Sequence, residues 1–272
     1  MSAGARVWYC YAVTRQLPPG AFEGLPGLRD STVDSDAEVD TVDCAGLSAV
    51  VSPVPAAEFG EAALRANLEN LGWLEEVARR HNDVVAEAAR RATTLPFRLA
   101  TIYLDRQRVH DVLRSGAERI GAALDRVEGR SEWGVKVYAE STARAVEQPV
   151  VPSGSADPPG RSYLRKRLAE RRSRDAGWAR AEATAAEVDR ALGALAVDRR
   201  AHRPQSTRLS GGGEQNVLNV AYLVGDAGVE SFLAKADELR AAAGECRVEL
   251  TGPWVPYSFA LPDLGETEDT AS

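Results

Sequence analysis

The stretch Leu250-Thr251-Gly252-Pro253-Trp254-Val255-Pro256-Tyr257-Ser258-Phe259 completes the last strand expected in the chain and follows it with aromatic residues. From Cys246 onward apolar and polar residues alternate, which predicts a half-buried strand. The Gly-Pro pair should end this strand, because a proline offers no N–H group to a β-ladder. Trp254, Tyr257 and Phe259 then bring three large rings together beside two prolines. We expect these rings to fill part of a core; the alternative is a surface anchor.

The residues before this stretch predict one particular domain. From Trp133 the chain shows, in sequence order, a strand at 133–139, a helix at 161–196, strands at 205–209 and 217–224, a helix capped by Asp226, and the closing strand. This order is that of a ferredoxin-like (βαββαβ) domain. We therefore predict an α+β protein whose C-terminal domain, 129–272, is ferredoxin-like with a long helical insertion. A flexible Pro-rich insert is expected near 146–160, and a disordered tail after 261.

The N-terminal half, residues 1–128, predicts a second α+β domain, a small sheet with helices. Val7 to Val13 is a continuous apolar run typical of a central strand. Residues 39–52 predict a hairpin of two strands that turns at Ala45-Gly46, and the prolines after it should end the second strand. Residues 18–36 are rich in Gly, Pro, Asp and Ser and predict a loop.

Two amphipathic helices follow the hairpin. Apolar or aromatic side chains recur every three or four residues, at Leu71, Leu74, Ala78, His81, Val85, Ala88 and Ala92 in the first helix and at Val109, Val112, Leu113, Gly116, Ile120, Leu124 and Val127 in the second. Asp105 has the position and the side chain of an N-cap for the second helix, which Glu128-Gly129 ends. We place the boundary between the two domains near Gly129.

Composition and charge exclude several classes of protein. With 272 residues and a net charge of −7, the chain can bury a sizeable core and is too acidic for a general polyanion binder. No apolar run approaches the roughly 20 residues that a membrane helix needs, and the N-terminus has no signal-peptide layout. Cys10, Cys44 and Cys246 are scattered in apolar strands, which predicts buried free thiols in a reducing cytoplasm.

No group of residues predicts a catalytic, metal or cofactor site. His81, His110 and His202 do not share a metal-ligand spacing. His81 lies on the apolar face of its helix and should be a core residue with one hydrogen-bond partner. The run Ser210-Gly211-Gly212-Gly213 lacks the Lys-Ser/Thr of a phosphate-binding loop and predicts a hairpin turn. Paired carboxylates fall in exposed helix faces or loops, where nothing converges on them for acid–base catalysis.

The strongest charge feature is a basic cluster made of Arg161, Arg165, Lys166, Arg167, Arg171, Arg172 and Arg174. Such a run is a solvated helix face or, alternatively, a docking face for an acidic partner. The βαββαβ order also occurs in RNA-binding domains, which stack bases on rings of their third strand. Here the equivalent strand, 216–224, carries one ring and lacks an Arg-Gly-Phe pattern. We therefore expect no nucleic-acid binding.

Taken together, these segments resemble the gas vesicle protein F/L family (GvpF/GvpL). The matching segments run through most of the chain: 8–13 (WYCYAV), 47–52 (LSAVVS), 70–75 (NLGWLE), 78–81 (ARRH), 95–98 (LPFR), 132–137 (EWGVKV), 160–164 (GRSYL), 219–224 (NVAYLV) and 251–259 (TGPWVPYSF). Each segment alone is weak evidence for the family, whereas their order along the chain is specific. The segments do not separate the F-like branch of the family from the L-like branch. One departure is Leu99-Ala100-Thr101, where the family more often has Phe-Gly-Thr.

The resemblance implies a non-enzymatic accessory protein of gas vesicle formation, cytoplasmic and associated with gas vesicles. It implies binding to the small, hydrophobic shell protein and to other accessory proteins during early assembly or nucleation, with no cofactor and no membrane contact. It also implies two α+β domains with a ferredoxin-like C-terminal half. Two alternatives stay open: a small-ligand-binding regulatory protein and, third, an RNA-binding protein.

For partner binding we expect two surfaces. The half 1–128 should form an apolar groove with a polar rim for the shell protein, and its candidate residues are Trp8, Tyr9 and Tyr11. The basic cluster should bind other accessory proteins, and its candidates are Arg165, Lys166, Arg167, Arg171 and Arg172. The remaining family-motif residues, which we expect to be structural, are Trp73, His81, Arg98, Trp133, Tyr163, Trp254, Tyr257 and Phe259.

Overall fold

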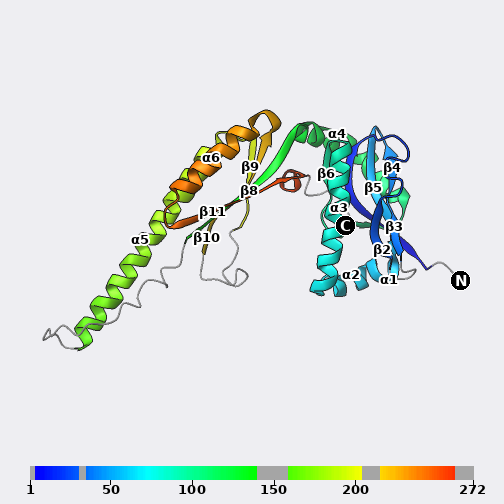
Figure 1. The fold of residues 1–272 in the computed structure, drawn as a ribbon. Helices are drawn as coiled ribbons and strands as arrows, with labels where there is room; N and C mark the ends of the chain where they lie inside the picture. Colours follow the sequence, from blue (N-terminus) through cyan, green and yellow to red (C-terminus); the bar gives the residue numbers. More distant parts are fainter. Residues whose placement is uncertain (1–3, 31–34, 140–158, 204–214, 261–272) are drawn as a thin grey trace, which may run out of the picture. The chain divides into compact units, whose positions relative to one another are not determined.

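The chain folds into two compact units in a computed structural model that describes residues 4–30, 35–139, 159–203 and 215–260 (Figure 1). The first unit consists of Met1–Ser131 together with the segment that begins at Trp254, and the second unit is Glu132–Pro253. The last described residues therefore belong to the first unit, whereas the sequence placed them in the C-terminal domain. The predicted strand at 205–209, the turn at 210–213, most of the insert near 146–160 and the tail after 261 lie outside the described residues.

An antiparallel sheet organises the first unit. Its strands are β1 (Arg6–Arg15), β4 (Asp40–Cys44), β5 (Leu47–Pro55), β6 (Thr94–Pro96) and β7 (Ile102–Tyr103). The order is β4-β5-β1-β6, and β7 also pairs with β1. The prediction of a central strand for the apolar run in β1 is thus confirmed. The predicted hairpin is confirmed as well, because β4 and β5 pair from Cys44 opposite Leu47 and turn at Ala45 and Gly46, both with positive φ.

The prediction that two prolines end the second hairpin strand is wrong. Pro53 and Pro55 lie within β5, opposite Trp8 and Arg6 of β1. The backbone N–H of Ala56 donates to Ala5, so in the alternating antiparallel pattern the two proline nitrogens point away from β1. On that side β4 has already ended, since its first residue lies opposite Val51. Neither proline therefore removes a ladder hydrogen bond.

Four helices and a small hairpin complete the first unit. They are α1 (Ala56–Phe59), α2 (Glu61–Asn67), α3 (Leu71–Arg91) and α4 (Arg106–Val127), with the hairpin of β2 (Pro26–Asp30) and β3 (Ser35–Glu38). β2 and the start of β3 lie within the stretch 18–36, where only a loop was predicted, whereas residues 19–24 form turns. Asp105 caps α4 as predicted, since its carboxylate accepts from the N–H of Arg108 at 2.7 Å. α3 packs on the sheet face that carries Tyr9 and Tyr11, and α4 contacts β4, β5 and β6.

The buried face of α3 differs slightly from the predicted one. Its buried residues are Val77, His81, Val84, Val85 and Ala88. Leu71, the first residue of the predicted apolar face, is exposed at the start of the helix. Leu71 continues the three-to-four-residue spacing of the buried face. Because it lies in the first turn of α3, it can extend past the part of the sheet on which the rest of that face packs.

The second unit is built on a four-stranded sheet with the order β11-β8-β10-β9. In chain order its elements are β8 (Arg130–Ala139), α5 (Pro159–Gly193), β9 (Asp198–Ala201), β10 (Gln215–Gly225), a 3-10 turn η2 (Asp226–Gly228), α6 (Val229–Ala242) and β11 (Cys246–Trp254). Figure 1 shows α5 and α6 side by side against this sheet. Their core side chains include Val188, Leu192 and Phe232, which pack with Trp133 and Tyr222 of the strands.

Two local predictions for this unit need correction. β10 lies between β8 and β9, and the strand β9 at Asp198–Ala201 was not predicted. It is an edge strand with three exposed residues, so it carries no apolar alternation. Asp226 does not cap α6: it begins η2, and Gly228 is the N-cap residue of α6 without a side-chain hydrogen bond.

The aromatic stretch near the C-terminus separates into exposed and buried rings. β11 runs through the Gly-Pro pair to Trp254, and a proline is tolerated there because β11 is an edge strand. Trp254 is 56% exposed, so the expectation that its ring fills a core is wrong. Phe259, at the end of a 3-10 turn η3 (Tyr257–Phe259), is 3% exposed and confirms that expectation for its own ring. Tyr257 is partly exposed and donates its O–H to Asn82 at 2.7 Å.

Candidate functional site

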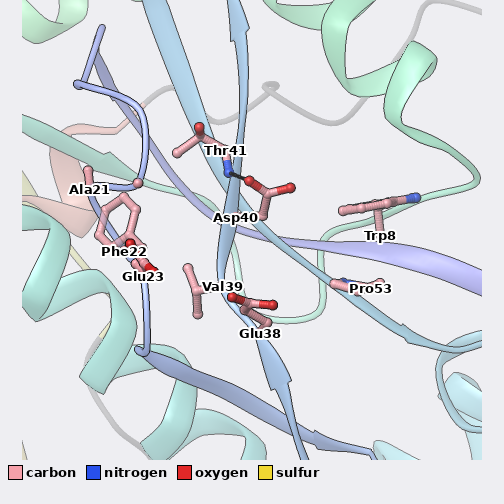
Figure 2. Close-up of a pocket in the computed structure, with 10 residues that line it drawn as sticks. Trp8, Ala21, Phe22, Glu23, Glu38, Val39, Asp40, Thr41 and Pro53 are labelled. Carbon is pink, nitrogen blue, oxygen red and sulfur yellow. Dashed lines mark hydrogen bonds between the residues drawn. The ribbon is translucent and has the colours of Figure 1, made fainter.

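The first unit contains a pocket of about 400 Å³, here called the Trp8 pocket (Figure 2). Its lining residues come from β1, β3, β4, β5 and the loop before β2, and they are Trp8, Gly20, Ala21, Phe22, Glu23, Glu38, Val39, Asp40, Thr41 and Pro53. Of the predicted partner-binding residues, Trp8 is therefore part of a concave surface. The loop residues at 20–23 were not predicted, although an isolated Phe in a Gly-rich loop is a signal that could have pointed to them.

The Trp8 pocket combines apolar and acidic surfaces. Phe22 and Val39 are buried and belong to the core of the first unit, so the apolar part of the pocket is continuous with that core. Glu23, Glu38 and Asp40 are exposed at its rim. A concavity that brings apolar and charged residues together resembles the mixed surface through which proteins bind one another.

Two arginines of the chain cover the aromatic rings of the pocket. The guanidinium of Arg106 lies over the Trp8 ring at 4.8 Å, donates to the carbonyl of Thr41 at 2.6 Å and pairs with Asp40. The guanidinium of Arg91 lies over the Phe22 ring at 5.1 Å. Both contacts are cation–π interactions, which are favourable when a cation lies within about 6 Å of a ring centroid.

The remaining carboxylates of the rim are not neutralised in this way. Within the described ranges no cation lies at ion-pair distance from the Glu23 or Glu38 side chain, whereas Asp40 has Arg106. The pocket therefore presents two available negative charges next to an apolar surface. This arrangement was not predicted, because no motif or periodicity in the sequence links residues 23 and 38.

Tyr9 and Tyr11, the other partner-binding candidates of the first half, belong to a buried hydrogen-bond network instead. Both side chains are fully buried, so neither can contact a partner in this structure, and that prediction is wrong. The hydroxyl group of Tyr9 is hydrogen-bonded to Nδ1 of His81 at 2.9 Å and accepts from the N–H of Ala100 at 3.1 Å. Tyr11 donates to Ser52 at 3.1 Å. In a β-strand alternate residues share a face, so these two rings point to α3 while Trp8 points away from it.

Burial sets the protonation of this network. Burial lowers the pKa of His81 to about 4, so the imidazole is neutral in the folded protein at neutral pH. Burial also raises the pKa of Tyr9 and raises that of Tyr11 to about 12. The prediction of a core histidine with a hydrogen-bond partner is confirmed, and the role of the network is structural.

Close packing at Gly27 completes the network. The Oη of Tyr11 also accepts from the N–H of Leu28 at 2.9 Å, which ties β2 to the central strand. A Cβ at Gly27 would lie 2.4 Å from Oγ of Ser52 and 2.8 Å from Oη of Tyr11. Gly27 is thus required because a side chain would displace the hydroxyl groups that join the hairpin to the sheet.

Most of the remaining motif residues have structural surroundings. Trp73 donates its indole N–H to Glu58 at 2.7 Å, and its ring lies 5.4 Å from that of Phe59. Trp133 is buried with its ring 6.3 Å from that of Phe232. Arg98 is exposed. The side chain of Tyr163 lies outside the described residues.

The basic cluster is described only in part. Arg167, Arg171 and Arg172 are exposed on α5. The side chains of Arg165 and Lys166 lie outside the described residues, so this surface stays a prediction.

The aromatic ring on which an RNA-binding domain of this type would stack a base is not accessible here. Tyr222, the ring of β10, is fully buried and donates its O–H to Asp189 at 2.8 Å. Among the described residues no group of three or more His, Cys, Asp or Glu side chains is arranged to hold a metal ion. No helix in the same part of the chain is both long and apolar enough to cross a membrane.

Comparison with known proteins identifies the family. A family model described as gas vesicle synthesis protein GvpL/GvpF matches residues 7–261. A gas vesicle protein L from Streptomyces sp. (strain CB03234) is 42% identical over 267 residues, which are 97% of each chain. A gas vesicle protein F2 from Halobacterium salinarum is 26% identical over 230 residues, covering 83% of this chain and 81% of its own. The chain therefore belongs to the GvpL/GvpF family, which supports a role in gas vesicle formation and is not a known enzyme family.

Solved structures of the same family share the fold. The crystal structure of the gas vesicle protein GvpF from Anabaena sp. PCC7120 matches with a TM-score of 0.63 and 17% identity, over 94% of this chain and 96% of that one. The GvpF structure from Microcystis aeruginosa matches with a TM-score of 0.59 and 16% identity, over 94% and 99%. At these identities the likeness concerns the fold, and it agrees with the predicted mixture of helices and sheets.

Proposed function

We propose that this chain is a cytoplasmic accessory protein that binds the hydrophobic gas vesicle shell protein, and other accessory proteins, during early assembly or nucleation of the vesicle. The observation that carries the proposal is the Trp8 pocket, a concavity in the first unit whose lining combines apolar residues with exposed carboxylates. Shell subunits that have not yet assembled expose apolar surface, which aggregates unless another surface covers it. The pocket offers such a surface while its charged rim keeps the accessory protein itself in solution.

The two halves of the chain have separate roles in this proposal. The N-terminal half, 1–128, holds the Trp8 pocket and binds the shell protein. The second unit, Glu132–Pro253, is a ferredoxin-like domain that presents the basic cluster to acidic accessory proteins. Its sheet order and the alternation of strands and helices support the ferredoxin-like assignment. The exposed Arg167, Arg171 and Arg172 support the second surface.

Co-expression with the shell protein tests the first role. The affinity-tagged full-length chain should recover shell protein as a soluble complex, and Trp8→Ala should recover less of it. Trp178→Ala is the matched control, because Trp178 is another partly exposed tryptophan, on α5, away from the pocket residues in sequence and in a different unit. Melting temperatures of both variants show whether the fold is retained.

The outcomes separate the parts of the proposal. Shell protein that stays insoluble and unbound with the wild-type chain refutes shell binding altogether. A soluble complex that Trp8→Ala leaves unchanged refutes the placement in the pocket. Charge reversal at Arg167, Arg171 and Arg172 should weaken recovery of an accessory protein, and an unaltered pull-down would argue against the second surface.

A further inference from the structure

The rim of the Trp8 pocket indicates which kind of side chain it binds. We propose that the pocket accepts an arginine or lysine side chain from a segment of the shell protein, with apolar residues of the same segment packed against the pocket wall. This inference rests on the proposed function and adds the chemistry by which the partner is recognised.

Charge complementarity is the first argument. Glu23 and Glu38 both line the pocket with Val39 (Figure 2). Neither carboxylate has a basic side chain at ion-pair distance among the described residues. An entirely apolar occupant would cover these carboxylates without neutralising them, and loss of water from an unpaired charge opposes binding. A basic side chain flanked by apolar residues satisfies both surfaces of the pocket at once.

The chain itself shows how a guanidinium is held at this place. Arg106 lies over the Trp8 ring, pairs with Asp40 and donates to a backbone carbonyl of the same edge strand. Ring, carboxylate and carbonyl are the three groups that an arginine uses best, since its planar cation stacks and donates in several directions. The unpaired carboxylates extend the same chemistry across the pocket, where a basic residue of a partner would complete it.

The size of the effect follows from the exposure of these carboxylates. Exposed ion pairs are weakened by water and salt, so each glutamate should change affinity roughly two- to fivefold and the two together about tenfold. Added salt should lower the affinity for the wild-type chain because it screens exposed charges. Apolar contacts supply the rest of the affinity and should respond little to salt.

The test uses the full-length chain with two probes. The first probe is the full-length shell protein, recovered by co-expression and pull-down. The second is a set of fluorescently labelled, overlapping shell-protein peptides of about 15 residues, each also made with every Arg and Lys replaced by Gln, with binding measured by anisotropy at low and high salt. The variant is Glu23→Gln with Glu38→Gln, and the matched control is Glu75→Gln with Glu118→Gln, which removes two exposed carboxylates of the first unit outside the pocket.

The expected result has three parts. Peptides with a basic residue beside apolar ones bind the wild-type chain, and they bind the pocket variant about tenfold more weakly. Their Gln versions lose a similar share of affinity. The control variant binds like the wild-type chain.

Failure of the inference differs from failure of the proposed function. If the shell-protein complex forms but the pocket variant and the Gln peptides bind as well as their parents, recognition of a basic side chain is refuted and shell binding stands. The same conclusion follows if the complex forms and no peptide binds. If neither the shell protein nor any of its peptides binds the wild-type chain, both proposals are refuted.

Discussion

Replacing His81 by glutamine should remove a specific pH dependence from the stability of the first unit. In the folded protein burial lowers the pKa of His81 to about 4, against an ordinary value of 6.5. Between these two values the unfolded chain binds a proton at this residue and the folded chain does not. Stability that depends on neutral His81 is therefore fully present above about pH 6.5 and is lost as the pH falls toward 4.

The magnitude follows from the two pKa values. Their separation corresponds to a loss of about 3 kcal/mol between about pH 7 and pH 4, of which about 2 kcal/mol is already lost at about pH 5. Because His81 is only 2% exposed, solvent screens this effect little. Glutamine does not titrate, yet its side-chain amide can form a hydrogen bond with the hydroxyl group of Tyr9. Carboxylates elsewhere titrate in the same range, but they do so in both proteins and cancel in the difference.

Hydrogen exchange followed by mass spectrometry measures this effect for the first unit separately from the second. Exchange from peptides of α3 gives the free energy of opening at several pH values, for the wild-type chain and for His81→Gln. The wild-type chain should lose about 3 kcal/mol more than the variant over this range. If the free energy of opening depends on pH in the same way in both proteins, His81 is not buried in a neutral state. That result would also refute the assignment of a structural hydrogen-bond network.

Five further substitutions test the packing and the helix caps. Phe259→Ala should lower stability by about 3–5 kcal/mol because the ring is buried, whereas Trp254→Ala should change it by about 0.5 kcal/mol or less. Equal melting temperatures for these two variants would contradict the division between buried and exposed rings. Gly27→Ala should destabilise the first unit by about 1–3 kcal/mol, because the added methyl group enters the hydroxyl network beside it. A wild-type urea midpoint for that variant would mean that the network can move aside. Asp105→Ala should cost about 1 kcal/mol through loss of the α4 cap, and Asp226→Ala should cost nearly nothing. The reverse order in thermal melts would refute the assignment of the caps.

The elements with strong apolar periodicity were predicted well because their burial is regular. The central strand at 6–15 is buried along almost its whole length, and the helix at 106–127 keeps one continuous buried face. The edge strand at 198–201 has the sequence Asp-Arg-Arg-Ala and mostly exposed side chains, so no alternation marks it. Prolines were misjudged for a related reason. A proline is compatible with a strand wherever its nitrogen faces an open side, as at an edge strand or beyond the end of a neighbouring strand, and sequence alone does not give the sheet order.

The candidate site was predicted only in part, for a different reason. Trp8 was identified because it belongs to an aromatic strand, and the same argument wrongly included Tyr9 and Tyr11, since it did not separate the two faces of that strand. Glu23 and Glu38 come from segments without regular patterning and are brought together only by the tertiary fold. Residues of this kind carry no periodic signal, because their proximity is set by the sheet and hairpin around them.

The return of the C-terminal segment to the first unit has a consequence for how the protein is made. Phe259 and Tyr257 pack with residues that the ribosome produces long before them, and the whole of the second unit is synthesised in between. During translation the core of the first unit therefore lacks Phe259 until almost the entire chain has emerged. Domains that are continuous in sequence can fold as they leave the ribosome. Here the N-terminal unit is instead the last to be completed, and a nascent chain stalled before residue 254 would leave it incomplete.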